Sequence, residues 1–272
     1  MTISMNRRTL AKVGTFGALS AFFGTTVQAQ AKETQSPNWD EETDIIVVGS
    51  GFAGLAAAYE AKKRNADVII LEKMPTAGGN SIINGGIMAV PGTEIQKSKG
   101  IKDSPELMMK DTIKAGLGLN HPDKVKAMCE EAYPAYRMLV DELGVKFSDT
   151  ILKHEGGHSV PRSMYTINGR GSEIVTKQLA ALEKLGVKPR IRTIVDKIFV
   201  DPEGKVIGVA VRQNYRFGKE NSGKPKNIKA RKAVILANGG FSADVAYRSM
   251  FDPKLGEAFQ TTNQPGATAE LW

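Results

Sequence analysis

Short runs of consecutive apolar residues stand out in the middle of this chain. Residues 44–48 and 67–71 each consist of one aspartate followed by four isoleucine, valine or leucine residues, a pattern typical of strands buried on both faces. Residues 55–65 between them are rich in alanine and predict a helix. Three later segments also favour strands, namely residues 194–200, 206–212 and 233–237.

Amphipathic segments lie between these strands. Residues 104–116 predict a helix that begins at a Ser-Pro pair and ends at a glycine. Residues 123–143 predict a second helix, kinked at Pro134, and residues 172–185 predict a third. The combination of buried strands and helices favours an α/β fold.

The first 31 residues have the pattern of an export signal. A pair of arginines precedes a mildly apolar run, residues 13–27, and small residues suited to cleavage follow it. A membrane anchor needs about 20 strongly apolar residues, and this run is shorter and rich in glycine and threonine. We therefore expect a twin-arginine signal peptide at residues 1–31 and a periplasmic protein without a stable membrane anchor. Polar residues 32–42 predict a flexible lead-in to one domain, residues 43–272.

Composition is that of a soluble globular protein and excludes two function classes. Apolar residues make up 41% of the chain and charged residues 24%, which is the usual balance. The formal net charge is +8, and several bases lie in residues 219–232, where we expect a solvated hairpin. No aromatic platform accompanies these bases, so nucleic-acid binding is not expected. Cys129 is the single cysteine, which excludes an internal disulfide and covalent haem at a CxxCH motif.

A glycine-rich turn joins the first expected strand to the first expected helix. Gly49, Gly51 and Gly54 form a GxGxxG motif, and Glu72 ends the second strand 18 residues beyond the last glycine. In dinucleotide-binding folds these glycines permit the tight turn, the approach of a pyrophosphate and the close packing of helix on strand. The helix start at Ala53 offers unpaired N–H groups to phosphates, and the Glu72 carboxylate suits ribose hydroxyls. The motif predicts a dinucleotide site.

A second glycine-rich loop favours FAD over NAD as the dinucleotide. It covers residues 78–86, with a glycine pair at each end, and its small side-chain bulk suits it to lie against a flat ring and a ribityl chain. About 120 residues separate Glu72 from the strand at residue 194, whereas an NAD domain would continue as a simple alternation of strands and helices.

Four segments resemble one flavoprotein family. They are DIIVVGSGFAGLAAA at residues 44–58, VIILEKMPTAGGNSIINGGI at 68–87, AVILANGGF at 233–241 and TTNQPGATAE at 261–270. The chain is similar to the flavoproteins of fumarate reductases and succinate dehydrogenases, and most similar to the soluble periplasmic branch with flavocytochrome c fumarate reductases and urocanate reductases. The four segments span almost the whole chain after the leader.

The resemblance implies a FAD-binding Rossmann-like fold of the glutathione reductase type. Its parallel sheet would carry an antiparallel β flap at residues 195–232, with helices on one side. In the membrane-bound branch a histidine attaches FAD covalently, and because Gly79 stands at that position here, we expect non-covalent FAD. Gln264 replaces a histidine that is frequent in the family. With the motif glycines, the implied cofactor contacts are Gly49, Gly51, Ala53, Gly54, Glu72, Lys73, Gly79, Asn80, Ser81, Gly85, Gly86, Val195, Gly239 and Glu270.

The family reaction needs residues that the resemblance does not find in this chain. Flavin hydride reduces the C=C bond of an unsaturated carboxylate, and the proton donor and carboxylate clamp belong to a capping domain and a last segment beyond residue 272. We therefore expect a truncated or fragmentary chain that lacks the capping domain, has no catalytic residue and is inactive alone. A separate multihaem cytochrome c would donate electrons to the complete enzyme.

Two other functions fit the same FAD domain. One is a flavin-dependent dehydrogenase of the ketosteroid type, and the other is a non-catalytic flavin-binding or assembly module. Both are alternatives to the reductase of a small unsaturated carboxylate.

A zinc-site pattern is also present but is not expected to bind metal. Residues 154–158 read HEGGH, which matches HExxH, yet two glycines and the nearby Pro161 favour a loop over the helix that this zinc site requires. In the resembling family this stretch lies near the flavin. We expect either that His158, Arg162 or Ser163 faces the cofactor or that these are solvated loop residues.

Overall fold

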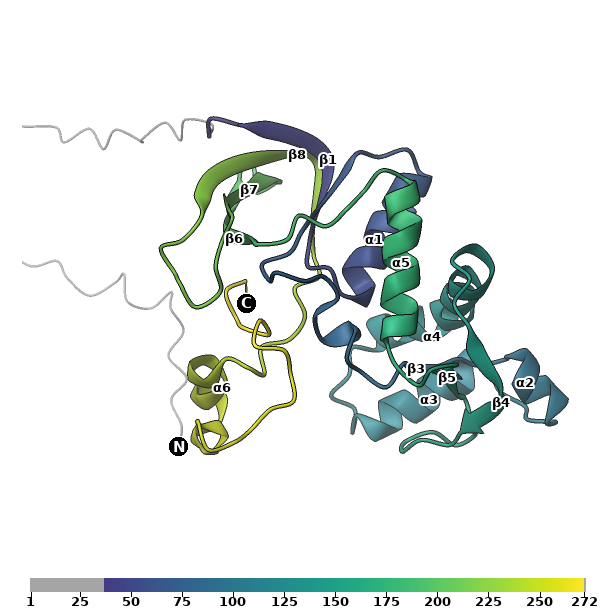
Figure 1. Ribbon diagram of the computed structural model, residues 1–272. Coiled ribbons are helices and arrows are strands. Elements are labelled where there is room, and N and C mark those ends of the chain that lie inside the picture. Colours follow the sequence, from purple (N-terminus) through teal and green to yellow (C-terminus); the bar gives the residue numbers. More distant parts are fainter. Residues whose placement is uncertain (1–36, 272) are drawn as a thin grey trace, which may run out of the picture. The chain divides into compact units, whose positions relative to one another are not determined.

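The computed structural model describes residues 37–271, and the expected signal peptide and the first part of the lead-in lie outside this range. Its main feature is one five-stranded mixed sheet (Figure 1). The strand order is β2-β1-β8-β7-β6, with bounds β2 Val68–Leu71, β1 Glu41–Val48, β8 Lys224–Leu236, β7 Val206–Gln213 and β6 Thr193–Val200.

The sheet combines the predicted parallel centre and antiparallel flap. Strand β1 pairs in parallel with β2 and with β8, while β7 pairs antiparallel with both β8 and β6. The flap is thus continuous with the central sheet through β8. This arrangement confirms the predicted α/β fold class.

Strand β8 is longer than its apolar run predicts. It begins at Lys224, nine residues before the expected start, and includes most of the basic stretch at residues 219–232. Ile228 and Ala230 are buried, whereas the lysines and the arginine around them are less so. This alternation is that of a half-buried strand, and the high charge of the segment obscured it. The hairpin prediction holds, and the exposed residues include both the turn before Lys224 and, within β8, Lys224, Arg231 and Lys232.

Two helices cover one face of the sheet and the flap curls over the other. Helices α1 (Phe52–Lys63) and α5 (Ser172–Lys184) lie side by side in Figure 1 and pack on one face. Their buried core contains Val47, Leu55, Ala58, Ile70, Val175 and Leu182. Because neighbouring strand residues point to opposite faces, the other core joins β1 and β2 to the flap through Ile46, Val48, Ile69, Leu71, Val195, Val209 and Val211.

A second, three-stranded sheet lies within the long insertion and was not predicted. Its order is β3-β5-β4, and its strands pair antiparallel. The strands are short and lack a long apolar run, which is why the sequence did not indicate them. Their bounds are β3 Ile87–Ala89, β5 Ser163–Thr166 and β4 Phe147–Lys153.

The predicted helices of the insertion are confirmed. Helix α3 (Pro105–Ala115) begins after Ser104, whose hydroxyl accepts a hydrogen bond from the Leu107 N–H, and it ends at Gly116. Helix α4 (Pro122–Arg137) contains Pro134 and continues into a π-helical turn that ends before Gly144. The remaining elements are α2 Glu94–Ser98, α6 Val245–Phe251, the π turn Met138–Glu142 and the 3-10 turns Gly79–Ser81 and Pro253–Leu255.

The described residues contain no helix long and apolar enough to cross a membrane. Strand β1 begins at Glu41, inside the expected lead-in, because its backbone pairs with Ile228. The Glu41 carboxylate also contacts Arg190 at 2.6 Å and Lys226 at 2.7 Å. These two cations hold the pKa of Glu41 at about 2.

Replacement of Glu41 by glutamine tests this anchor of the sheet. An acid with a lowered folded-state pKa stabilises the protein above its unfolded-state pKa, and this stabilisation is lost as the pH falls through the folded-state value. Glu41→Gln should therefore lower the free energy of unfolding at pH 7 by about 2 kcal/mol. This is less than the full pKa shift corresponds to, because the side chain is about one quarter exposed and solvent screens the charges. Urea titrations should show the difference from wild type shrinking as the pH falls from 5 towards 2. A difference independent of pH would contradict this assignment.

Candidate cofactor-binding site

A cavity opens where the central parallel strands end. Its walls are the first glycine turn, the end of β2, the start of β6, the second glycine loop, and the segments at 237–240 and 264–271. In open α/β sheets, ligands bind in the crevice beyond the carboxyl ends of parallel strands. The cavity is therefore at the position that this topology provides for a ligand.

The first glycine turn brings free backbone amides to the cavity. A Cβ atom on Gly54 would overlap the carbonyl oxygen of Gly49, so the start of α1 can cross β1 this closely only with glycine. The N-cap, Gly51, has no side-chain cap, and the first turn of α1 contains no acid. The Phe52 N–H donates to the Ser81 hydroxyl at 3.0 Å, which joins the turn to the second glycine loop. The other N–H groups of this turn are available to an anion.

The Glu72 carboxylate braces the same turn. It is buried and accepts hydrogen bonds from the Ser50 hydroxyl at 2.5 Å, from the Ser50 N–H and from the Met74 N–H. The Ser50 hydroxyl in turn accepts from the Gly78 N–H at 3.0 Å. Each carboxylate oxygen can accept more than one hydrogen bond, so Glu72 can also accept from a ribose that lies in the cavity.

A segment near the end of the described chain closes one side of the cavity. The Asn80 side chain donates to Asn263 at 2.5 Å and accepts from the Gln264 N–H at 2.7 Å. The Lys73 ammonium contacts the Glu270 carboxylate at 2.8 Å. Burial alone would raise the pKa of Glu270, but the hydrogen bonds from Lys73 and a nearby threonine hydroxyl outweigh it and lower the pKa. The carboxylate of Glu270 is therefore ionised at neutral pH.

This combination of glycine crossing, free amides and buried acid matches a known family of cofactor domains. The family model described as "FAD binding domain" matches residues 44–270, which is most of the chain. The chain belongs to the FAD-binding domain family. FAD is its cofactor, and the uncapped amides and the buried carboxylate at residue 72 are the donors and acceptor that a dinucleotide requires.

Two relatives of this FAD-binding domain are named as reductases. It is 40% identical over 98% of its length to the acrylate reductase flavoprotein subunit of Shewanella woodyi, covering 52% of that protein. It is 37% identical over 84% of its length to the urocanate reductase of Eggerthella lenta, covering 37% of that protein. The chain thus spans about half, or less, of the length of these relatives.

Solved structures show the same fold. The open conformation of a flavocytochrome c3 fumarate reductase has a TM-score of 0.78 and 30% identity, covering 86% of this chain and 40% of that one. A 3-ketosteroid-Δ4-(5α)-dehydrogenase from Rhodococcus jostii has a TM-score of 0.72 and 26% identity, covering 87% of this chain and 53% of that one.

Most predicted cofactor contacts of the FAD-binding domain line one cavity. Gly54 does not line the cavity, because it lies where α1 packs on β1. The glycine pair at residues 85–86 lies further along the second glycine loop and does not line the cavity either. The role of Ser50 in bracing the turn was not predicted, because Ser50 occupies a variable position of the GxGxxG motif. The predicted residues that line the cavity are Gly49, Gly51, Ala53, Glu72, Lys73, Gly79, Asn80, Ser81, Val195, Gly239 and Glu270.

The second glycine loop is tied to the turn that follows β5. The Gly86 carbonyl accepts from the Thr166 N–H at 3.0 Å, and the Gly171 N–H donates to the Asn84 carbonyl at 2.9 Å. A Cβ on Gly86 would lie 2.6 Å from the Arg170 carbonyl oxygen. A second hollow opens here, lined by Ile82, Ile83, Asn84, Gly85, Gly169, Arg170 and Ser172.

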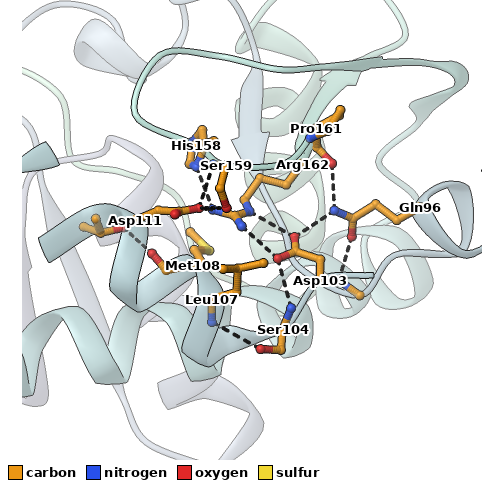
Figure 2. A network of polar contacts seen from close by, with 12 residues as sticks. Gln96, Asp103, Ser104, Leu107, Met108, Asp111, His158, Ser159, Pro161 and Arg162 are labelled. Carbon is orange, nitrogen blue, oxygen red and sulfur yellow. Dashed lines mark hydrogen bonds and ion pairs between the residues drawn. The ribbon is translucent and has the colours of Figure 1, made fainter. Parts of the chain in front are cut away.

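Arg162 neither faces the FAD cavity nor is solvated, which corrects both expectations for it. Its guanidinium is fully buried and pairs with Asp103 at 2.8 Å and with Asp111 at 2.7 Å (Figure 2). The Gln96 amide also donates to Asp103. Ser163 is likewise buried, in β5, and does not line the cavity. The sequence could not indicate this because the partners lie 59 and 51 residues away.

The HEGGH stretch is a loop between β4 and β5, as predicted, and the His158 side chain is hydrogen-bonded to Arg162. Arg162 can only donate, so the Nδ1 atom of His158, 2.9 Å away, accepts. Burial and the neighbouring Arg162 charge lower the pKa of His158. Among residues 37–271 no group of three or more potential ligands is arranged to hold a metal ion.

Arg162→Met tests the importance of the buried network. Removing one member of a buried ion pair leaves an uncompensated charge and costs about 3–5 kcal/mol. We expect this loss in the free energy of unfolding at pH 7, measured by urea titration, because Asp103 and Asp111 both lose their cation. Arg137→Met removes an exposed i,i+4 pair and should have a much smaller effect. Equal losses in the two variants would contradict the structural role of Arg162.

Proposed function

We propose that this chain is the FAD-binding part of a flavoprotein reductase that reduces the C=C bond of a small unsaturated carboxylate. The observation that carries the proposal is the 40% identity to an acrylate reductase flavoprotein subunit along 98% of the chain. The urocanate reductase relative and the fumarate reductase structure support the same substrate class. Acrylate, urocanate and fumarate each contain a C=C bond directly attached to a carboxylate.

Each part of the cavity has a role in holding the cofactor. The amides at the start of α1 would bind the pyrophosphate, and Glu72 would accept hydrogen bonds from the adenosine ribose. The backbone at Val195 would contact the adenine, and the second glycine loop would lie against the ring system. Bound FAD supplies hydride transfer. The chain's own residues bind and orient it.

The flavin is proposed to be non-covalent. Gly79, which has no side chain to form a bond, stands where the resemblance places the attaching histidine of the membrane-bound branch. The described residues near it, Asn80 and Ser81, are engaged in hydrogen bonds to the neighbouring loop and to α1. Denaturation in acid should therefore release FAD into solution.

The partners and location of the complete enzyme belong to the same proposal. A separate multihaem cytochrome c is our proposed electron donor, and the similarity to a flavocytochrome c3 fumarate reductase supports a haem-containing partner. Twin arginines in the leader favour export to the periplasm. We assign no catalytic residue to this chain, which would hold FAD without turnover by itself.

Two other functions remain to be separated from this one. The ketosteroid dehydrogenase structure is nearly as similar in fold, which favours that reaction class as the second candidate. A flavin-binding module without catalysis would share the cavity but not the chemistry. Sequence identity favours the reductase, since the acrylate reductase relative is 40% identical and the steroid enzyme 26%.

A chimera tests whether this FAD-binding part supports catalysis, which a flavin-binding module would not. Residues 37–272 would replace the matching part of the Shewanella woodyi acrylate reductase subunit, and anaerobic oxidation of reduced methyl viologen would be followed with acrylate, fumarate, urocanate and a 3-ketosteroid. We expect stoichiometric FAD and reduction of an unsaturated carboxylate, with the 272-residue chain alone inactive. A chimera that binds FAD but reduces none of the carboxylates would contradict the proposal.

Glu72→Ala tests the predicted cofactor contact. The substitution removes both the brace of the first glycine turn and the acceptor for the ribose, and the loss of a charged hydrogen-bond acceptor should weaken FAD binding by at least about tenfold. Calorimetric titration of the apoprotein with FAD measures this. Glu203→Ala, in the exposed β6–β7 turn, is the matched control and should bind as wild type. Unchanged affinity in Glu72→Ala would refute the assigned contact.

A further inference from the structure

Arg170 lines the second hollow, and hydrogen bonds hold its backbone in place. The Arg170 N–H donates to the Thr166 hydroxyl at 3.0 Å, and the same hydroxyl donates to the Arg170 carbonyl at 2.9 Å. The Asn168 side chain accepts from the Arg170 N–H as well. The Arg170 carbonyl also abuts Gly86. The base from which the Arg170 side chain extends is therefore fixed against the second glycine loop.

The Arg170 guanidinium itself is exposed and unpaired. Within residues 37–271, Arg170, Arg192 and Arg216 have no hydrogen-bond or ion-pair partner for the guanidinium. The other described arginines bond to carboxylates or backbone carbonyls. The neighbouring acid, Glu173, accepts from the Lys146 N–H instead, so it does not neutralise Arg170.

Only Arg170 of these three lines either of the hollows described above. The wall around it combines the apolar side chains of Ile82 and Ile83 with the hydroxyl-bearing Ser172. Gly85, which we expect to face the flavin ring, lines the same hollow. An unneutralised guanidinium beside an apolar wall suits a small molecule with one carboxylate and a short carbon chain.

We propose that Arg170 binds the carboxylate of the substrate at the outer end of the second glycine loop. This inference rests on the proposed reductase function and adds a binding residue within the FAD-binding part. Arg170 is not at a position that the family resemblance assigns to the carboxylate clamp. Its ligand is a short-chain carboxylate, held by paired hydrogen bonds from the guanidinium.

Ligand titration of the FAD-loaded chain tests this site without turnover. Propionate is the probe because it carries the carboxylate but no C=C bond to reduce, and propionamide is its neutral counterpart. The change in flavin absorbance gives the Kd of each. We expect wild type to prefer propionate over propionamide, and Arg170→Gln to weaken propionate binding by about tenfold and abolish this preference. Arg170→Lys should restore part of it.

Arg216→Gln is the matched control, because Arg216 is also exposed and unpaired but lies in the β7–β8 hairpin. It should bind both probes as wild type does. Equal propionate affinity in Arg170→Gln and wild type would overturn the proposal, as would a wild-type chain that holds FAD but does not bind propionate. Loss of FAD from Arg170→Gln would reassign the residue to the cofactor. Failure of the wild type to bind FAD would instead contradict the proposed function.

Discussion

The whole cofactor site depends on the close crossing of α1 over β1. No side chain fits between Gly54 and the carbonyl of Gly49, and this contact brings the unpaired amides of α1 to the ends of the central strands. The Ser50–Glu72 hydrogen bonds then fix the turn to β2. A dinucleotide phosphate gains most from amides that are already oriented, because little ordering remains to be done on binding.

The second glycine loop depends on a different support. It begins under α1, where Ser81 accepts from Phe52, and ends against β5 and the turn beyond it. The inserted sheet is thus a scaffold for the part of the loop that we expect to face the flavin. The buried ion pairs of Arg162, the residue just before β5, in turn connect this strand to Asp103 and to Asp111 of α3 (Figure 2). Packing far from the pyrophosphate turn thereby contributes to the position of the ring-facing residues.

Sequence reasoning succeeded where the signal is local. The buried runs of β1 and β2, the glycines between them and Glu72 lie within about 30 residues, and their spacing has one physical explanation. It failed where partners are far apart in the chain. Arg162 meets its two aspartates only in the folded protein, and strands of three or four residues such as β3 and β5 carry too short a pattern to recognise. The basic segment of β8 shows a third cause, since its alternation was hidden by its charge.

The amount of FAD bound by Gly54→Ala measures how far the cofactor depends on the crossing of α1 over β1. Gly156→Ala is its control, since a Cβ on Gly156 meets no atom within 4 Å and that residue lies in the loop before β5. After purification and incubation with excess flavin, we expect bound FAD near one per chain in Gly156→Ala and less than about a tenth of that in Gly54→Ala. Full FAD occupancy in Gly54→Ala would show that the cofactor is not held by the turn that this crossing creates.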